Sequence, residues 1–241
     1  MSSKNVPRRM SMIVLALCFL PAALGQVALQ TQRLPLEQRL QIMEQASARS
    51  QQQLHSYQWI EATTLTIDGK AKEPKQSLCS YSADGHLIKK PMGGSGEPQI
   101  SGSPLKKHII KKKLEEFHEE MAQVGGLTAL YLPLNNGRLK DALHTRRVDY
   151  EHEQSAGFTV IVNDYAKPGD QLRLTINPDS LQIQRIVVQT YFDGPQDSLT
   201  ADVRFSELAD GTVYPSVTTI NAVGKKLQIA TVSSDFSRPV Q

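Results

Sequence analysis

The chain has 241 residues, of which 39% are apolar and 21% are charged, with 27 Lys and Arg against 24 Asp and Glu. This composition is too apolar for a disordered chain, and the length is sufficient for a sizeable hydrophobic core. Two cysteines exclude a disulfide-stapled scaffold and any Cys-rich zinc or iron–sulfur module. No apolar run approaches the ~20 residues that a membrane-spanning helix needs.

The N-terminus has the three-part pattern of a secretory signal. Lys4, Arg8 and Arg9 precede the apolar run 12–20, and Ala23 and Gly25 supply small residues at the expected cleavage site. We therefore expect residues 1–25 to be a signal peptide, cleaved after Gly25, which directs the chain to the periplasm. The Sec route is favoured over the twin-arginine route and over lipidation of Cys18. The residues next to the arginine pair do not fit a twin-arginine signal, and those next to Cys18 do not fit a lipoprotein signal.

Cleavage changes the charge balance. Removing Lys4, Arg8 and Arg9 leaves 24 basic residues against 24 acidic ones, so the processed chain has no net charge with His neutral. A general positive field for nucleic acid is therefore absent, and we expect no nucleic-acid partner. Cys79 remains without an internal partner, and its place in a strand-like run favours a buried, inert thiol.

The first half of the processed chain mixes helices and strands. Apolar residues recur at a helical period over 34–54, and β-branched and aromatic residues predict a strand over 57–67. Asp68-Gly69 and Asp84-Gly85 are hairpin signals that predict two further antiparallel strands, over 78–82 and 86–90. The Gly- and Pro-rich stretch 91–104 predicts a flexible loop. A second helix over 106–124 and short helical pieces over 127–132 and 138–143 follow.

Apolar and polar residues alternate from residue 158 almost to the C-terminus, predicting strands over 158–162, 172–176, 181–192, 199–208, 213–223 and 227–233. Six strands joined by short turns form a meander, and the apolar phase slips between Ile183 and Ile186, which indicates a bulge. The predicted fold is mainly β (α+β class): a curved antiparallel sheet, or half-barrel meander, covered by helices.

Three short motifs accompany this order of elements: Tyr57-Gln58-Trp59 after the first helix, residues 164–170 (DYAKPGD) before a strand, and residues 210–215 (DGTVYP) within the late meander. Together they resemble the LolA-like fold of periplasmic lipoprotein carriers and related sensor domains. The resemblance implies a single domain over 26–241 and an apolar ligand, such as an acyl chain or a lipoprotein. The long loop and the helical insert after it depart from the compact carriers and leave the cargo undefined.

Residues 106–120 form the most unusual stretch, with five lysines toward its start and four glutamates toward its end. Lys106, Lys107, Lys111, Lys112 and Lys113 are candidates for contact with anionic membrane headgroups, and the alternative is a solvated helix face. His118 lacks the second histidine of a helical zinc motif, and no catalytic motif is complete, so we expect no metal, no cofactor and no enzyme activity.

Two functions remain open: a carrier or binding protein for an apolar ligand, and a cell-envelope interaction or sensor module that grips a protein with the same sheet. A carrier would need a groove between sheet and helices. The candidate groove residues are Trp59, Leu65, Phe117, Met121, Leu172, Leu174, Ile176, Val203 and Phe205. Ordinary core packing would explain each of them equally well.

Overall fold

A computed structural model describes residues 36–93, 104–153 and 157–239. The helices are α2 (Leu36–Leu54), α3 (Pro104–Thr128) and α4 (Asn136–His144). The strands are β1 (Gln58–Ile67), β2 (Lys70–Ala71), β3 (Lys75–Tyr81), β4 (Leu87–Met92), β5 (Val148–Glu153), β6 (Gly157–Asn163), β7 (Gln171–Ile176), β8 (Ile183–Tyr191), β9 (Ser198–Glu207), β10 (Val213–Ala222) and β11 (Leu227–Ser237). The residues of the expected signal peptide, 1–25, and the middle of the expected loop, 94–103, lie outside this part.

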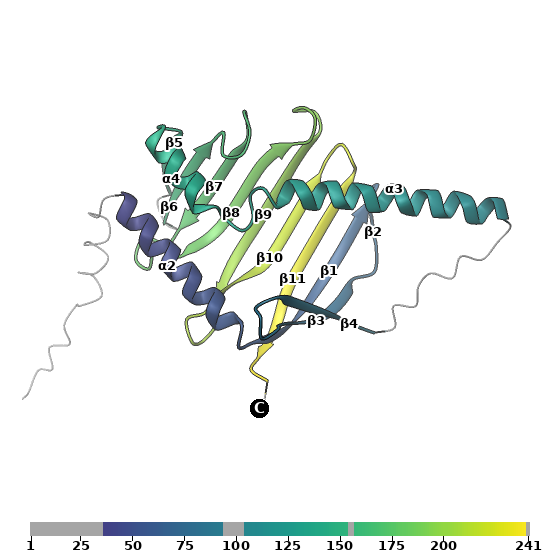
Figure 1. Ribbon diagram of the computed structural model, residues 1–241, viewed down its shortest axis with the longest axis horizontal. Helices are drawn as coiled ribbons and strands as arrows, with labels where there is room; N and C mark the ends of the chain where they lie inside the picture. Colours follow the sequence, from purple (N-terminus) through teal and green to yellow (C-terminus); the bar gives the residue numbers. More distant parts are fainter. Residues whose placement is uncertain (1–35, 94–103, 154–156, 240–241) are drawn as a thin grey trace, which may run out of the picture.

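All the strands belong to one open, twisted, antiparallel sheet (Figure 1). Its order is β4-β3-β1-β11-β10-β9-β8-β7-β6-β5, with the short β2 paired to β1. The C-terminal meander therefore forms most of the sheet, and the N-terminal strands extend it beyond β11. The predicted fold class, a mainly β sheet covered by helices, is confirmed.

The three helices pack on the same face of the sheet (Figure 1). Every second residue is buried along β7, from Ile186 to Thr190 in β8 and from Leu199 to Val203 in β9, as period-2 alternation requires. Met43 of α2, Val124 of α3 and Leu139 of α4 join these strand residues in one core.

Local signals in the sequence are confirmed where they are strongest. Asp68 and Gly69 both have positive φ, 50° and 74°, which is the type I′ geometry of a two-residue hairpin turn between β1 and β2. The predicted bulge is also present: Thr175 pairs with Arg185 and Ile176 with Ile183, so that one β8 residue is left over.

The structure differs from the sequence predictions in several boundaries. The meander has seven strands rather than six, because β5, which the alternation from residue 158 did not include, forms the sheet edge. β4 continues two residues into the expected loop, and α3 extends through Gly125 and Gly126 to Thr128, so no separate helix covers 127–132. Tertiary packing of Val124 and Leu127 outweighs the low helix propensity of the two glycines.

Candidate functional site

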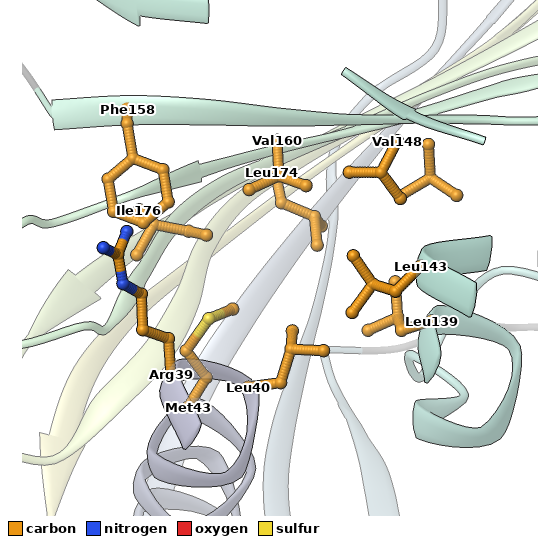
Figure 2. A pocket seen from close by; sticks show the side chains of 11 residues that line it. Arg39, Leu40, Met43, Leu139, Leu143, Val148, Phe158, Val160, Leu174 and Ile176 are labelled. Atoms are coloured by element: carbon orange, nitrogen blue, oxygen red, sulfur yellow. The ribbon is translucent and has the colours of Figure 1, made fainter. Parts of the chain in front are cut away.

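An apolar cavity lies between α2, α4 and the strands at the β5 edge of the sheet (Figure 2). Its floor consists of side chains that alternate toward the helices, namely Val148 of β5, Phe158, Val160 and Val162 of β6, and Leu174 and Ile176 of β7. Strands β6 and β7 pair in register, Val160 opposite Leu174 and Phe158 opposite Ile176, so these side chains form one continuous apolar surface.

The helices supply the roof. Arg39, Leu40 and Met43 come from the first turns of α2, where their spacing places them on one side of the helix. Leu139 and Leu143 come from α4, which Asn135 caps by accepting a hydrogen bond from the Arg138 amide at 3.1 Å. Both helices therefore direct an apolar stripe at the same three strands.

The cavity is small and its surface is almost free of polar groups. Its free space is about 10 Å³, the lower limit for a single water molecule. Arg39 is its one charged lining residue, and the guanidinium carbon lies 5.9 Å from the centre of the Phe158 ring (Figure 2). Burial raises the pKa of Tyr150 on β5, and the positive charge of Arg39 partly offsets that rise.

A wide surface cleft lies on the other side of the same roof. It holds about 690 Å³ of free space between α2 and α4, and most of the residues that line it are polar, such as Glu37, Gln41 and Lys140. Leu40 and Leu143 line both the cleft and the inner cavity, so these two side chains form the partition between them. An ion pair joins the helices across the cleft, with Lys140 Nζ 3.9 Å from a Glu44 carboxylate oxygen. Both side chains are exposed, so this link is weak.

The residues predicted from the sequence as groove candidates are distributed along the whole core. Only Leu174 and Ile176 line the cavity. Leu172 and Val203 are buried in the core, and Leu65, Phe117, Met121 and Phe205 are half-buried against it. The sequence analysis missed the cavity residues of α2, α4 and β6. The helical period of Leu40 and Met43 was visible, but only the fold reveals which strands they cover.

Trp59 belongs to a separate aromatic cluster at the β1 end of the sheet. Its ring stacks on Phe236 with centroids 5.6 Å apart, and Tyr81 and Tyr214 extend the cluster. Trp59 is buried, so this cluster fixes the C-terminal strand against β1 and takes no part in the cavity.

A polar cluster lies beside these aromatic rings. Asp210 accepts hydrogen bonds from the Tyr57 hydroxyl at 2.7 Å and from Arg238 at 2.5 Å. Hydrogen bonds from Thr212 and Tyr57 lower the pKa of Asp210 to about 2. The motif 210–215 thus ties the β9–β10 turn to the residue before β1 and to the residue after β11.

The motif 164–170 has a comparable structural role. The buried carboxylate of Asp170 accepts the amides of Tyr165, Ala166 and Lys167 at 2.6, 3.0 and 2.8 Å. It also accepts the Tyr131 hydroxyl at 2.6 Å. Burial and this hydrogen bond raise the pKa of Tyr131. The network joins the α3–α4 connection to the β6–β7 turn, and thereby fixes α4 above the cavity floor.

The lysine candidates lie on α3. Lys111, Lys112 and Lys113 are exposed, and Nζ of the first two lies 3.8 and 3.9 Å from Glu115 and Glu116 respectively. The side chains of Lys106 and Lys107 fall outside the described part. Cys79 is fully buried, as the strand pattern indicated, and burial raises the pKa of its thiol.

The described ranges contain neither a candidate metal site nor a candidate membrane-spanning helix. No group of three or more His, Cys, Asp or Glu side chains there could hold a metal ion. Among the same residues, no helix combines the length and the apolar character that crossing a bilayer requires.

Comparison with known proteins finds similarity in structure only. No sequence model of a protein family matches the chain, and no curated protein matches it significantly. A DUF1329 family protein from Desulfovibrio piger is similar with a TM-score of 0.40 and 9% identity, covering 86% of this chain and 94% of that one. A LolA superfamily protein from Nitrosomonas europaea is similar with a TM-score of 0.37 and 10% identity, covering 83% and 94%. Similarity this distant gives no information about ligand or activity.

Proposed function

We propose that the protein is a non-enzymatic carrier or binding protein for an apolar ligand of the acyl-chain type. The observation that carries the proposal is the apolar cavity, which only Leu40 and Leu143 separate from a surface cleft. An acyl chain suits a site whose lining is apolar except for Arg39, because burial of methylene groups supplies about 0.8 kcal/mol each. A lipoprotein would present the same chemistry through its acyl chains.

The ligand enters, in this proposal, by separation of α2 and α4. The cavity holds about 10 Å³ of free space, so an acyl chain fits only after the roof has moved. The exposed ion pair between Lys140 and Glu44 offers little resistance to such a movement. The C-terminal end of α2 is held more firmly, since Leu54 is buried and Ser50 accepts the Val213 amide at 3.2 Å. The N-terminal turns of α2 are therefore the part that moves.

The expected signal peptide places this function in the periplasm, after export by the Sec route and cleavage following Gly25. The partner is then a lipid or lipoprotein of the cell envelope. The alternative, an envelope interaction or sensor module, uses the same sheet to grip a protein and needs no acyl uptake.

Titration of the processed chain with a fluorescent fatty-acid probe tests the proposal. The wild-type protein is expected to bind the probe, and Leu143→Glu is expected to weaken binding at least tenfold, because a charge in the partition opposes entry of an acyl chain. Leu130→Glu is the matched control: Leu130 follows α3 and is 44% exposed, so its substitution is expected to leave binding unchanged. A folded wild-type protein that takes up no probe would remove the carrier function and favour the interaction module.

A further inference from the structure

Helix α3 extends well beyond the sheet that it covers. Its C-terminal half lies over the sheet, whereas its N-terminal half passes the β1–β2 edge and projects from the body of the protein (Figure 1). Residues 111–116 are all exposed, which agrees with this arrangement. We call residues 104–116 the overhang, which has a length of about 20 Å at 1.5 Å per residue.

The apolar stripe of α3 continues from the sheet into the overhang. Val124 is 1% exposed in the core, and Phe117 and Met121 are half-buried against the core. Leu114 follows on the same stripe but is 39% exposed. A helix that only covered the sheet would not need an apolar residue at this position.

The charged residues of the overhang are sorted around this stripe. Lys111 is three residues before Leu114 and Lys113 is four before Phe117, so each lysine neighbours the stripe on one side of it. Glu115 and Glu116 are about 100° or more around the helix from both apolar residues, whereas Glu120, beyond the overhang, lies three residues after Phe117 on the side of Lys113. Lys112 also lies on the far side, where it is near Glu116.

This arrangement suits a membrane surface. An exposed apolar residue flanked by lysines is a feature that interfacial helices share. The ion pair of Lys111 with Glu115 is exposed and 3.8 Å long, so it competes little with lipid phosphates. Because the processed chain is expected to carry no net charge, attraction to an anionic surface must come from a local cluster of this kind.

We propose that the overhang is a peripheral membrane-contact site, at which Lys111 and Lys113 bind anionic lipid headgroups and Leu114 enters the interface between them. The site is distinct from the acyl cavity, which lies at the other edge of the sheet. The competing occupant is an acidic protein surface. Binding to vesicles that contain no protein would distinguish a membrane from that occupant.

Co-sedimentation of the processed chain with vesicles tests this proposal. The wild-type protein is expected to bind vesicles of phosphatidylglycerol and phosphatidylcholine, and not vesicles of phosphatidylcholine alone. Lys111→Glu/Lys113→Glu is expected to reduce binding about tenfold or more, since each basic residue near an anionic surface contributes on the order of 1 kcal/mol. Leu114→Ser is expected to weaken binding severalfold at constant charge.

The double variant Lys72→Glu/Lys90→Glu is the matched control, with the same change in charge at two exposed positions outside α3. It is expected to bind as the wild type does, and an equal loss in this variant would overturn the assignment to α3. Failure of the wild type to bind anionic vesicles would also overturn it and favour an acidic protein as occupant. Uptake of the fatty-acid probe by Lys111→Glu/Lys113→Glu is expected to stay unchanged, which separates this result from the fate of the proposed carrier function.

Discussion

Leu174→Ala is expected to lower the free energy of unfolding by about 2–5 kcal/mol. Leu174 is 1% exposed on β7 in the cavity floor, and the roof above it leaves almost no free space. Truncation therefore removes buried methyl groups and opens a void that the surrounding strands cannot fill. Urea denaturation of the processed chain, followed by the fluorescence of Trp59, measures the change.

Val232→Ala is the control for this experiment. Val232 of β11 is 46% exposed, so its truncation is expected to cost no more than about 0.5 kcal/mol. A cost for Leu174→Ala well below 2 kcal/mol, combined with weaker uptake of an acyl probe, would contradict the packed floor. Leu174 would then line a groove that is already open.

Asp170→Ala is expected to cost about 3 kcal/mol or more, because it leaves three backbone amides and the Tyr131 hydroxyl without the carboxylate that they share. Tyr131→Phe removes only one of these hydrogen bonds and is expected to cost less. The exposed Asp193, in the β8–β9 turn, provides the control substitution Asp193→Ala with little effect. Thermal unfolding of the three variants ranks them, and a near-wild-type melting temperature for Asp170→Ala would show that the network does not fix α4.

The fold could be predicted from the sequence to the extent that its signals are local. Asp68-Gly69 determines its hairpin through backbone conformation alone, and the slip between Ile183 and Ile186 marks its bulge directly. The pairing of β1 with β11 joins residues more than 150 positions apart, such as Leu65 and Ile229. No local pattern specifies that contact, because any exposed strand edge offers the same backbone groups.

The candidate site was less accessible to sequence analysis for the same reason. Alternation correctly assigned Leu174 and Ile176 to the covered face of the sheet. It could not indicate that α2 and α4, rather than α3, lie above them, because an amphipathic helix buries its stripe equally well on any apolar strand. Trp59 was placed with the groove residues on its strand chemistry, whereas its ring stacks on Phe236, which comes from the distant C-terminal strand β11.

A reversible cross-link between α2 and α4 tests the proposed carrier function most directly. The exposed pair Glu44 and Lys140 is replaced in Glu44→Cys/Lys140→Cys, and the two thiols are joined by a short linker that contains a reducible disulfide. Because Cys79 is fully buried, the folded protein directs the reagent to the two new cysteines. The linked protein is expected to take up the fatty-acid probe at least tenfold more weakly than the unlinked protein, and reduction of the linker is expected to restore uptake. Equal uptake before and after reduction would contradict the carrier function proposed here, since the ligand would then bind without separation of α2 from α4.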